Sequence, residues 1–188
     1  MLLNYYSILI YTKDEKLMSV IKSILPVQIF ESEFYSDINA VKRNLSNRRY
    51  DVILLDAEDP EVIEFSFSVG DDSTVVVLLC PVSNFETVSE RVEGDGIITL
   101  AKPFDSFRFY SIMKIVIAVV HKMQNINLKT IKLKEKMDEI RIVNRAKLLL
   151  VKNLSMTEQE AHRHIEKKAM DRCLKKSEIA EQIIRTYG

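Results

Sequence analysis

Glycine and proline are distributed very unevenly along this chain. All four prolines and three of the four glycines lie in residues 1–103, and from Phe107 onward neither occurs until Gly188, the last residue. Both residues interrupt helices, so a stretch this long without them predicts one long helix followed by further helical segments. The turns of any sheet must therefore lie in the first part of the chain.

Short apolar runs alternate with amphipathic segments in residues 1–105. The runs are rich in β-branched residues and comprise Ser7–Tyr11, a weaker Val27–Glu31, Asp51–Leu55, Thr74–Leu79 and Gly96–Leu100. Such runs are typical of strands buried on both faces of a parallel sheet. Apolar residues at helical spacing in Glu15–Leu25 and Ser36–Asn47 complete the alternation. We therefore expect a doubly wound α/β domain, with its site at the carboxyl ends of the strands.

One connection of this domain has a weaker pattern. The segment between Pro60 and Thr74 reads EVIEFSFSVGDDS and shows little helical period. It is short for a connection that must hold a crossover helix and two loops. We therefore expect a departure from the regular alternation at this point.

Two strand ends carry chemistry. Asp56 ends the third run, in YDVILLDAEDP, and Lys102-Pro103-Phe104 follows the fifth. This resembles the receiver domain of response regulators, in which an Asp accepts a phosphoryl group, a Pro lies four residues on and a Lys pairs with the phosphoryl group. The resemblance implies a flavodoxin-like fold and Asp56 as the phosphoacceptor candidate. It also implies a pocket that we expect to contain Thr12, Lys13, Cys80 and Lys102.

The receiver pattern is incomplete. An aspartyl phosphate requires a divalent metal to offset its charge, and receivers supply it through an acidic pair after the first strand. Thr12-Lys13 occupies that place here, and Asp14 and Glu15 are expected to begin the next helix. Cys80 also replaces the usual Thr or Ser, and Thr99 replaces the common aromatic switch residue.

Two interpretations of Asp56 follow. In an active receiver it takes phosphate with Mg²⁺, which is the single cofactor that the sequence suggests. In a pseudo-receiver it is a carboxylate held by Lys13 and Lys102 that never takes phosphate. We favour the second interpretation, although a one-residue shift in the alignment would restore a carboxylate beside Asp56.

One face of the long helix carries apolar residues in alternating steps of four and three. They are Ile112, Val116, Val119, Met123, Ile126, Leu133, Met137 and Ile140, with Thr130 in the gap and Asn144 at the end. A 3.5-residue repeat over four heptads predicts a coiled coil, and Asn at an a position favours a parallel pair, so we expect a homodimer. The first three residues could instead pack on the sheet as the last helix of the α/β domain. The two roles are compatible.

The last 48 residues predict three short helices. The first ends near Lys152–Asn153; the second is capped by Ser155 or Thr157 and runs to about Cys173; the third begins near Ser177. Their apolar residues are expected to share one small core: Val143, Ala146, Leu150, Ala161, Ile165, Ala169, Leu174, Ile179, Ala180 and Ile183. A core of this size is marginal alone, so we expect the coiled coil to support it.

Four dipeptides occur in order within residues 136–186: Ala146-Lys147, Glu160-Ala161, Ala169-Met170 and Ile179-Ala180. Their order and spacing resemble the ANTAR domain. The resemblance implies a receiver-like domain, a coiled coil and a three-helix module in that order. It also implies binding to hairpins in nascent leader RNA, with relief of transcription termination. His162 departs from the family, which usually has Tyr or Phe there, although imidazole can still stack on a base.

The resemblance and the local charge together give a set of expected RNA-binding residues. The set comprises Arg141, Arg145, Ala146, Lys147, His162, Lys167, Lys168, Ala169, Met170, Arg172, Lys175 and Lys176. Lys168, Arg172 and Lys175 are expected on one helical face, at i, i+4 and i+7. A solvated charged face is the ordinary alternative for such a run. The domains are then 1–106 (receiver-like or pseudo-receiver), 107–140 (coiled-coil dimerisation helix) and 136–188 (ANTAR).

The formal net charge of zero conceals two opposite halves. Residues 1–121 hold 11 Lys+Arg against 18 Asp+Glu, a net −7, whereas residues 122–188 hold 16 against 9, a net +7. The basic half suits a nucleic-acid partner. We expect RNA and a second copy of the chain as partners, with a sensor kinase or regulatory protein as a candidate and no membrane.

Several other classes are disfavoured. The first 15 residues have no basic region or cleavage site of a signal peptide, and two distant cysteines fit a reducing compartment, so we expect a cytoplasmic protein. No catalytic grouping and no phosphate-binding loop is visible, which argues against an enzyme, and His162 and His164 diverge on a helix, so no metal site is expected.

Two alternatives to an RNA-binding antitermination regulator remain open. A DNA-binding two-component response regulator would use the last helices as a helix-turn-helix, but no short Gly-containing turn is present between them. A signalling adaptor without a nucleic-acid partner would use the basic end to bind an acidic protein.

Overall fold

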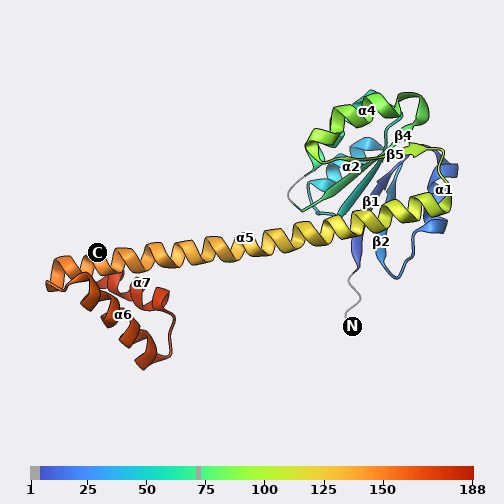
Figure 1. The fold of residues 1–188 in the computed structure, drawn as a ribbon. Coiled ribbons are helices and arrows are strands. Elements are labelled where there is room, and N and C mark those ends of the chain that lie inside the picture. The colour runs from blue at the N-terminus through green and yellow to red at the C-terminus, as the bar shows by residue number, and fades with distance from the viewer. Residues whose placement is uncertain (1–4, 71–72) are drawn as a thin grey trace. The chain divides into compact units, whose positions relative to one another are not determined.

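The chain divides into two compact units, one ending at Asn127 and the other beginning at Leu128. The computed structural model describes residues 5–70 and 73–188, so part of the N-terminal segment considered above, residues 1–4, lies outside it. One helix, α5 (Ser106–Leu154), contributes to both units. Each unit has its own hydrophobic core. Figure 1 shows the helices and strands of both units.

The first unit is built on a parallel sheet of order β2-β1-β3-β4-β5. The strands are β1 (Tyr6–Tyr11), β2 (Phe30–Tyr35), β3 (Val52–Asp56), β4 (Val75–Pro81) and β5 (Ile98–Lys102). In the register, Ile8 of β1 lies between Ser32 of β2 and Val52 of β3. This is the strand order of a flavodoxin-like doubly wound fold, so the predicted fold class is confirmed.

Helices cover both faces of the sheet (Figure 1). They are α1 (Glu15–Ile24), α2 (Ile38–Leu45), α3 (Pro60–Val69), α4 (Phe85–Val92) and α5, with short 3-10 turns at Val82–Asn84 and Glu93–Asp95. Successive strand residues point to opposite faces. Ile8 and Ile10 therefore pack with α1 and the first turns of α5, whereas Leu9 and Tyr11 pack with α2, α3 and α4.

Helix α3 forms although its sequence has little helical period. Pro60 lies in its first turn, where a missing N–H costs nothing, and the helix ends at Gly70. Its buried Val62 and Ile63 are joined by partly buried Phe65, so apolar residues surround most of the helix and hide the period. The expected departure from the alternating pattern is therefore wrong for residues 60–69. Residues 71–72 of the same segment lie outside the described residues.

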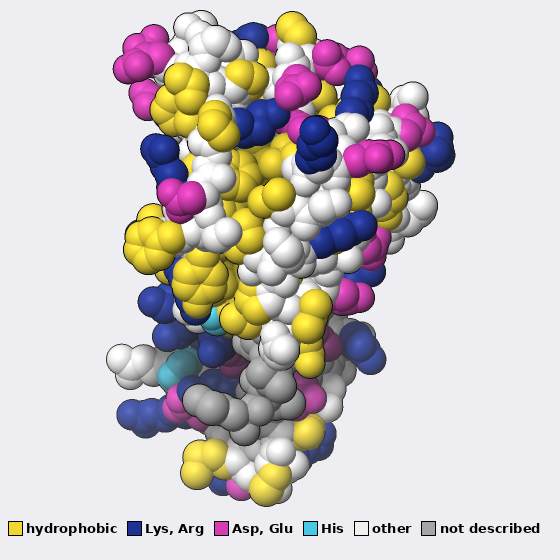
Figure 2. All heavy atoms as spheres, turned by 90° about the vertical axis from the view of Figure 1, so that its right-hand side faces the viewer, with side chains coloured by type: hydrophobic (Ala, Val, Ile, Leu, Met, Phe, Trp, Pro, Cys, Tyr) yellow, Lys and Arg dark blue, Asp and Glu magenta, His cyan; other side chains and the backbone are white. Residues whose placement is uncertain are grey.

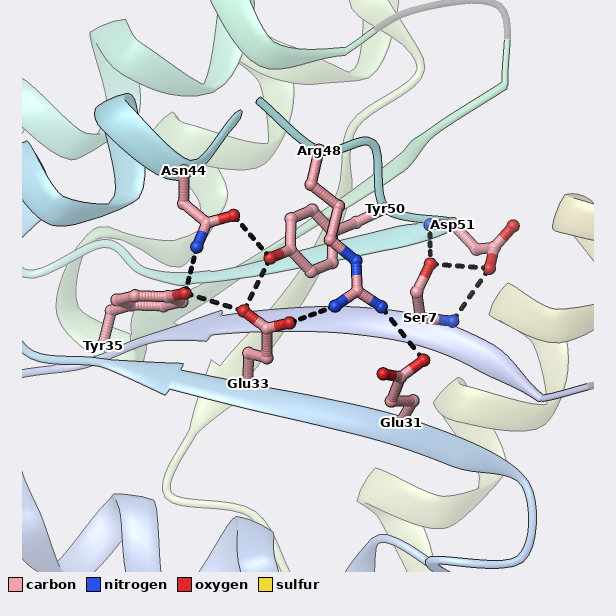
Figure 3. Close-up of polar contacts among 8 residues, drawn as sticks. All are labelled: Ser7, Glu31, Glu33, Tyr35, Asn44, Arg48, Tyr50 and Asp51. Atoms are coloured by element: carbon pink, nitrogen blue, oxygen red, sulfur yellow. Dashed lines mark hydrogen bonds and ion pairs between the residues drawn. The ribbon is translucent and has the colours of Figure 1, made fainter. Parts of the chain in front are cut away.

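The edge strand β2 is fixed by a polar network (Figure 3). The Glu33 carboxylate accepts hydrogen bonds of 2.7 Å from the hydroxyls of Tyr35 and Tyr50, and it pairs with Arg48. Arg48 also pairs with Glu31 at 3.0 Å. The tyrosine hydroxyls, chiefly that of Tyr35, lower the pKa of Glu33. The network ties β2 to the segment that precedes β3.

The first turns of α5 belong to the sheet domain. Phe109, Met113, Val116 and Val120 are buried in its core, with four other residues of α5 partly buried there: Ile112, Ile117, Val119 and Met123. Polar contacts add to this packing, because the His121 ring is hydrogen-bonded to the Tyr6 hydroxyl and Gln124 donates to Asp51 at 3.1 Å. The predicted apolar face of the long helix thus packs on the sheet over its first turns. α5 is long, yet neither it nor another helix among the described residues is apolar enough to cross a membrane.

Some apolar side chains remain exposed on the first unit. Figure 2 shows a face on which they gather between charged side chains. An apolar groove in this unit is lined by residues from α1, the following loop and α5, among them Ile24, Pro26, Ile29, Phe109 and Met113. The groove marks where the end of α1 meets the first turns of α5.

The second unit consists of the end of α5 with α6 (Glu158–Arg172) and α7 (Lys176–Tyr187). Thr157 caps α6 in a capping box with Glu160, as its spacing predicted. The core contains eight buried residues: Ala146, Leu150, Ala161, Ile165, Ala169, Ile179, Ala180 and Ile183. Val143 packs against it and Leu174 is 37% exposed, so the prediction of Leu174 as a core residue is wrong. The backbone of Cys173 is in the left-handed conformation, so the chain turns there and Leu174 points out of the core.

Candidate functional site

Asp56 lies at the carboxyl edge of the sheet and is almost fully buried, at 4% exposed. Both of its carboxylate oxygens are engaged. Oδ2 accepts a hydrogen bond of 2.7 Å from the hydroxyl of Thr12, which follows β1, and Oδ1 accepts one from the ammonium of Lys102, at the end of β5. Three strand ends therefore converge on one carboxylate, as expected for a doubly wound sheet.

Lys102 links Asp56 to a second carboxylate that the sequence did not indicate. Its ammonium also pairs with Glu58 at 2.9 Å. Burial lowers the pKa of Lys102, but the hydrogen bonds from its ammonium to Asp56 and Glu58 outweigh this, and the pKa is raised overall. A charged Lys102 thus neutralises the buried carboxylate.

Lys13 does not hold Asp56. Its ammonium pairs with Asp59 at 2.8 Å, in the loop after β3, and the side chain is largely exposed. The prediction that Lys13 and Lys102 would hold Asp56 together is therefore wrong for Lys13. Thr12 takes that place, because its short side chain stays at the sheet edge while the longer lysine reaches outward.

The arrangement does not fit a magnesium ion. Mg²⁺ requires several oxygen ligands in octahedral geometry. Asp14 caps α1, accepting from the backbone N–H groups of Lys16 and Leu17, and Glu58 and Asp59 are each paired with a lysine. Residues 5–70 and 73–188 contain no cluster of three or more His, Cys, Asp or Glu side chains arranged to hold a metal.

Cys80 completes the pocket from the end of β4. It is fully buried, and burial raises the pKa of its thiol to about 11. The thiol is thus neutral and a weak hydrogen-bond donor. Of the expected pocket, the structure brings together Thr12, Cys80 and Lys102 with Asp56, and it directs Lys13 elsewhere.

The second unit presents most of its expected binding side chains to solvent. Arg141 and Arg145 on α5, Lys167 and Arg172 on α6, and Lys175 before α7 are exposed. Arg172 also donates to Gln182 at 2.9 Å, across to α7. Because α6 ends at Arg172, Lys175 lies outside that helix. The predicted shared helical face is therefore wrong for Lys175.

The two alanines of the expected RNA-binding set are buried instead. Ala146 and Ala169 lie in the core of the unit at 0% and 6% exposed. Their small side chains let α5, α6 and α7 approach closely, so both residues take part in helix packing. Met170, which follows Ala169 in the chain, is by contrast 78% exposed.

Comparisons with known proteins agree with both halves of this description. The ANTAR domain family matches residues 132–184. Residues 132–184 are an ANTAR domain. The transcriptional regulatory protein PdtaR of Mycobacterium tuberculosis is 23% identical over 141 residues, which span 73% of this chain and 69% of PdtaR.

Solved structures resemble the chain in fold. The signal receiver domain of an HD domain-containing protein from Pseudomonas fluorescens has a TM-score of 0.58 and 18% identity, covering 66% of this chain and 96% of that domain. Full-length FixJ from B. japonicum has a TM-score of 0.56 and 10% identity, covering 96% of this chain and 98% of FixJ. The chain therefore joins a receiver-like domain to an ANTAR domain.

Lys147 of the ANTAR domain forms an ion pair with a carboxylate of the same domain. Its side chain is 15% exposed and its ammonium pairs with Glu158, at the start of α6, at 2.8 Å. The ion pair lowers the pKa of Glu158. A groove beside it is lined by Lys147, Glu158, Gln159, His162 and Arg163. Lys147 thus reaches a ligand only if Glu158 gives way, a contact that dipeptide spacing cannot reveal.

His162 is also engaged, although its side chain stays accessible. Glu166 lies 3.3 Å from His162 and pairs in addition with Lys176 of α7. Glu166 therefore links two of the expected binding residues, and Lys168 is partly buried on the same helix.

The positive charge of the ANTAR-containing unit is concentrated on α5. Residues 128–154 carry eight Lys+Arg against three Asp+Glu, a net +5, whereas residues 155–188 carry seven against six, a net +1. The cations of α6 and α7 are largely balanced by neighbouring carboxylates. The part of the unit best suited to phosphate is consequently α5.

Proposed function

We propose that the chain is an RNA-binding regulator of transcription antitermination that binds hairpins in nascent leader RNA as a homodimer. The observation that carries the proposal is the ANTAR domain at residues 132–184. In this proposal the protein acts in the cytoplasm as a regulator and not as an enzyme. The exposed cations on α5 supply phosphate contacts, and Met170 and His162 are available to unpaired bases.

Filter binding with a tandem-hairpin leader RNA tests the proposal. We expect retention of this RNA well above that of a scrambled RNA, with affinity falling steeply as salt rises. Arg145→Gln, on the exposed surface of α5, should weaken binding. Arg185→Gln, at an exposed position near the end of α7, is a matched control that should not. Equal retention of both RNAs would contradict specific recognition.

The receiver-like domain, in this proposal, regulates RNA binding without phosphate on Asp56. Support comes from the two engaged oxygens of Asp56 and from a donor set that does not suit Mg²⁺. Its input is then a partner protein and not phosphoryl transfer from a sensor kinase. Incubation with a small-molecule phosphodonor and Mg²⁺, followed by intact mass measurement, should add no phosphoryl mass. A mass increase that Asp56→Asn abolishes would contradict this.

A second candidate function is DNA binding. One observation favours it: α6 and α7 are joined by the three residues Cys173–Lys175, and left-handed Cys173 allows the tight turn for which a helix-turn-helix often uses glycine. Against it, α7 carries two cations and two carboxylates, which is a weak charge for a helix in the major groove. Duplex DNA competing with hairpin RNA at the same salt concentration separates the two functions.

A further inference from the structure

A pocket opens at the carboxyl edge of the sheet, beside the buried carboxylate of Asp56. It lies within the first unit, and its lining comes from the start of α1, the loop after β3 and the ends of β4 and β5. Its volume of about 410 Å³ is within the usual range for small-molecule sites, about 300–1,000 Å³. Asp56 itself is not part of the lining, so a ligand in the pocket would leave that carboxylate in place.

Much of the lining is apolar and held in place from behind. It includes Leu17 and Val20 of α1 and, after β5, Pro103 and Phe104. The ring of Phe104 stacks on that of Phe109, with centroids 5.1 Å apart, and Phe109 is fully buried. Val20 is 43% exposed, so apolar surface remains for a ligand to cover. The apolar part of a ligand would therefore meet a surface that is already formed.

The same lining contains two cations. Lys102 ends β5, and Lys16 lies exposed in the first turn of α1. In the part of the chain that the structure describes, no carboxylate lies within ion-pair distance of the Lys16 ammonium. The neighbouring carboxylate of Asp14 caps α1, accepting hydrogen bonds of 2.8 and 3.2 Å from the backbone N–H groups of Lys16 and Leu17. The side-chain charge left without a partner in this pocket is therefore positive.

Glu58 pairs with Lys102 from an exposed position. The two charged groups lie 2.9 Å apart, although the side chain of Glu58 is 61% exposed and that of Lys102 only 13%. Asp56 holds the same ammonium from inside the domain. Water screens an exposed carboxylate, so the pair with Glu58 contributes little free energy. A carboxylate attached to an apolar group can displace Glu58, because burial of that group adds free energy that Glu58 does not have.

We propose that this pocket binds a small monocarboxylate with an apolar group. The ligand carboxylate takes the place of Glu58 at Lys102, and the apolar group covers Val20 and the rest of the apolar lining. Lys16 supplies a second positive charge in the same pocket. Glu58 turns to solvent, and Asp56 keeps both of its contacts. Binding requires neither a phosphoryl group nor RNA, so its test is separate from that of the proposed function.

Methyl NMR of the full chain titrated with phenylacetate tests the proposal. The methyl signals of Leu17 and Val20 should shift with a dissociation constant on the order of 1 mM, as expected for a ligand of this size. Two matched probes separate the contributions: phenylacetamide lacks the charge, and acetate lacks the apolar group. Each should bind roughly tenfold more weakly than phenylacetate.

Three results would overturn the proposal. Equal binding of phenylacetamide would remove the role of the cations, and equal binding of acetate would remove the role of the apolar lining. The third result is the absence of any shift at Leu17 and Val20 up to about 20 mM phenylacetate, well above the expected dissociation constant.

A change at Glu58 tests the displacement. Glu58→Gln removes the competing carboxylate, so the dissociation constant for phenylacetate should fall by roughly threefold. Glu61→Gln makes the same charge change outside the lining, where Glu61 pairs with Lys42 at 3.1 Å, and is the matched control. Its affinity should stay close to that of the unchanged chain. Equal effects of the two variants would show that phenylacetate does not compete with Glu58.

A change at Lys16 tests the second cation without disturbing the buried ion pair. Lys16→Gln alters an exposed side chain, so the domain should stay folded while the affinity for phenylacetate falls by roughly threefold. Lys122→Gln, exposed on α5 and outside the lining, is the matched control and should leave the affinity unchanged. An equal loss in both variants, or none in either, overturns the assigned pocket.

Discussion

The receiver-like unit and the ANTAR-containing unit differ in the size of the apolar side chains that form their hydrophobic cores. The sheet of the first unit is buried on both faces by large side chains, including Ile8, Leu54, Leu79 and Phe109. Half of the eight buried residues in the second unit are alanines. Apolar burial scales with side-chain area, so the second unit has a much smaller reserve of stability per residue.

The two units also differ in how far their charged groups are buried. Asp56 and Lys102 form an ion pair inside the first unit, where Thr12 and Glu58 satisfy the remaining polar atoms. In the second unit the cations of α5 other than Lys147 stay in solvent. A buried carboxylate with both oxygens engaged suits a structural role, whereas exposed cations on a small domain suit a partner that supplies counter-charge.

The largest expected effect is on the small core. Leu150→Ala removes a large side chain that is 1% exposed, and a change of this kind costs about 2–5 kcal/mol, enough to unfold a domain with so little core. Circular dichroism with limited proteolysis should report loss of α6 and α7 while residues 5–127 stay protected. Leu148→Ala, 69% exposed on the same helix, is the control and should change stability little. A folded second unit in Leu150→Ala would show that the core difference is overstated.

The buried carboxylate of Asp56 gives the next largest effect. Thr12→Val keeps the shape of a buried side chain but removes the donor to Asp56, and leaving such a buried acceptor without its partner costs about 1–3 kcal/mol. Urea unfolding measures the difference. Thr99→Val, which loses a half-buried hydrogen bond to Ser89, should cost less. If the two variants are equally stable, the hydroxyl of Thr12 does not hold Asp56.

Much of the fold was predictable because its signals are local. Buried parallel strands are apolar at successive positions, and the predicted runs at Ser7–Tyr11 and Asp51–Leu55 agree with β1 and β3 to within about a residue. The edge strand β2 was displaced, since Val27–Glu31 was expected and Phe30–Tyr35 is found. Glu31 and Glu33 interrupt its apolar pattern, as an edge strand with polar partners permits.

The candidate site was less predictable because its partners come from loops. Asp56 and Lys102 end β3 and β5, which lie on either side of β4, and their pairing followed from the resemblance to receiver domains. The pairing of Lys13 with Asp59 depends on the path of the loop after β3, which no pattern encodes. The pairing of Lys147 with Glu158 depends likewise on how α6 leaves the turn after Leu154.

A smaller effect is expected from the network at the edge of the sheet. Hydrogen bonds from Tyr35 and Tyr50 lower the pKa of Glu33 below its ordinary value of 4.5. A lowered folded-state pKa stabilises the protein above the unfolded value, and this contribution is lost as the pH falls through the folded value. Glu33→Gln should therefore cost about 1 kcal/mol near neutral pH, and the difference should shrink in acid as the pH falls through the folded-state pKa.

Urea unfolding of the unchanged chain and of Glu33→Gln, near neutral pH and in acid, measures the difference in the free energy of unfolding. Glu31→Gln removes a more exposed carboxylate from the same arginine and should cost less. A difference that grew in acid would have the wrong sign and would remove Glu33 as the source.

The smallest expected effect tests whether an internal ion pair competes with the ligand in the ANTAR domain. Glu158→Gln frees the ammonium of Lys147, which is otherwise paired at 2.8 Å, so affinity for hairpin RNA should rise by roughly threefold through one more available phosphate contact. Glu181→Gln removes the same charge from a looser pair on α7, with Arg185 at 3.9 Å, and controls for the change in net charge. Filter binding at one salt concentration compares them. If both variants raise affinity equally, the gain comes from the change in net charge, and Lys147 does not contact RNA. A gain confined to Glu158→Gln indicates that Lys147 contacts RNA and that its ion pair with Glu158 must break for RNA to bind.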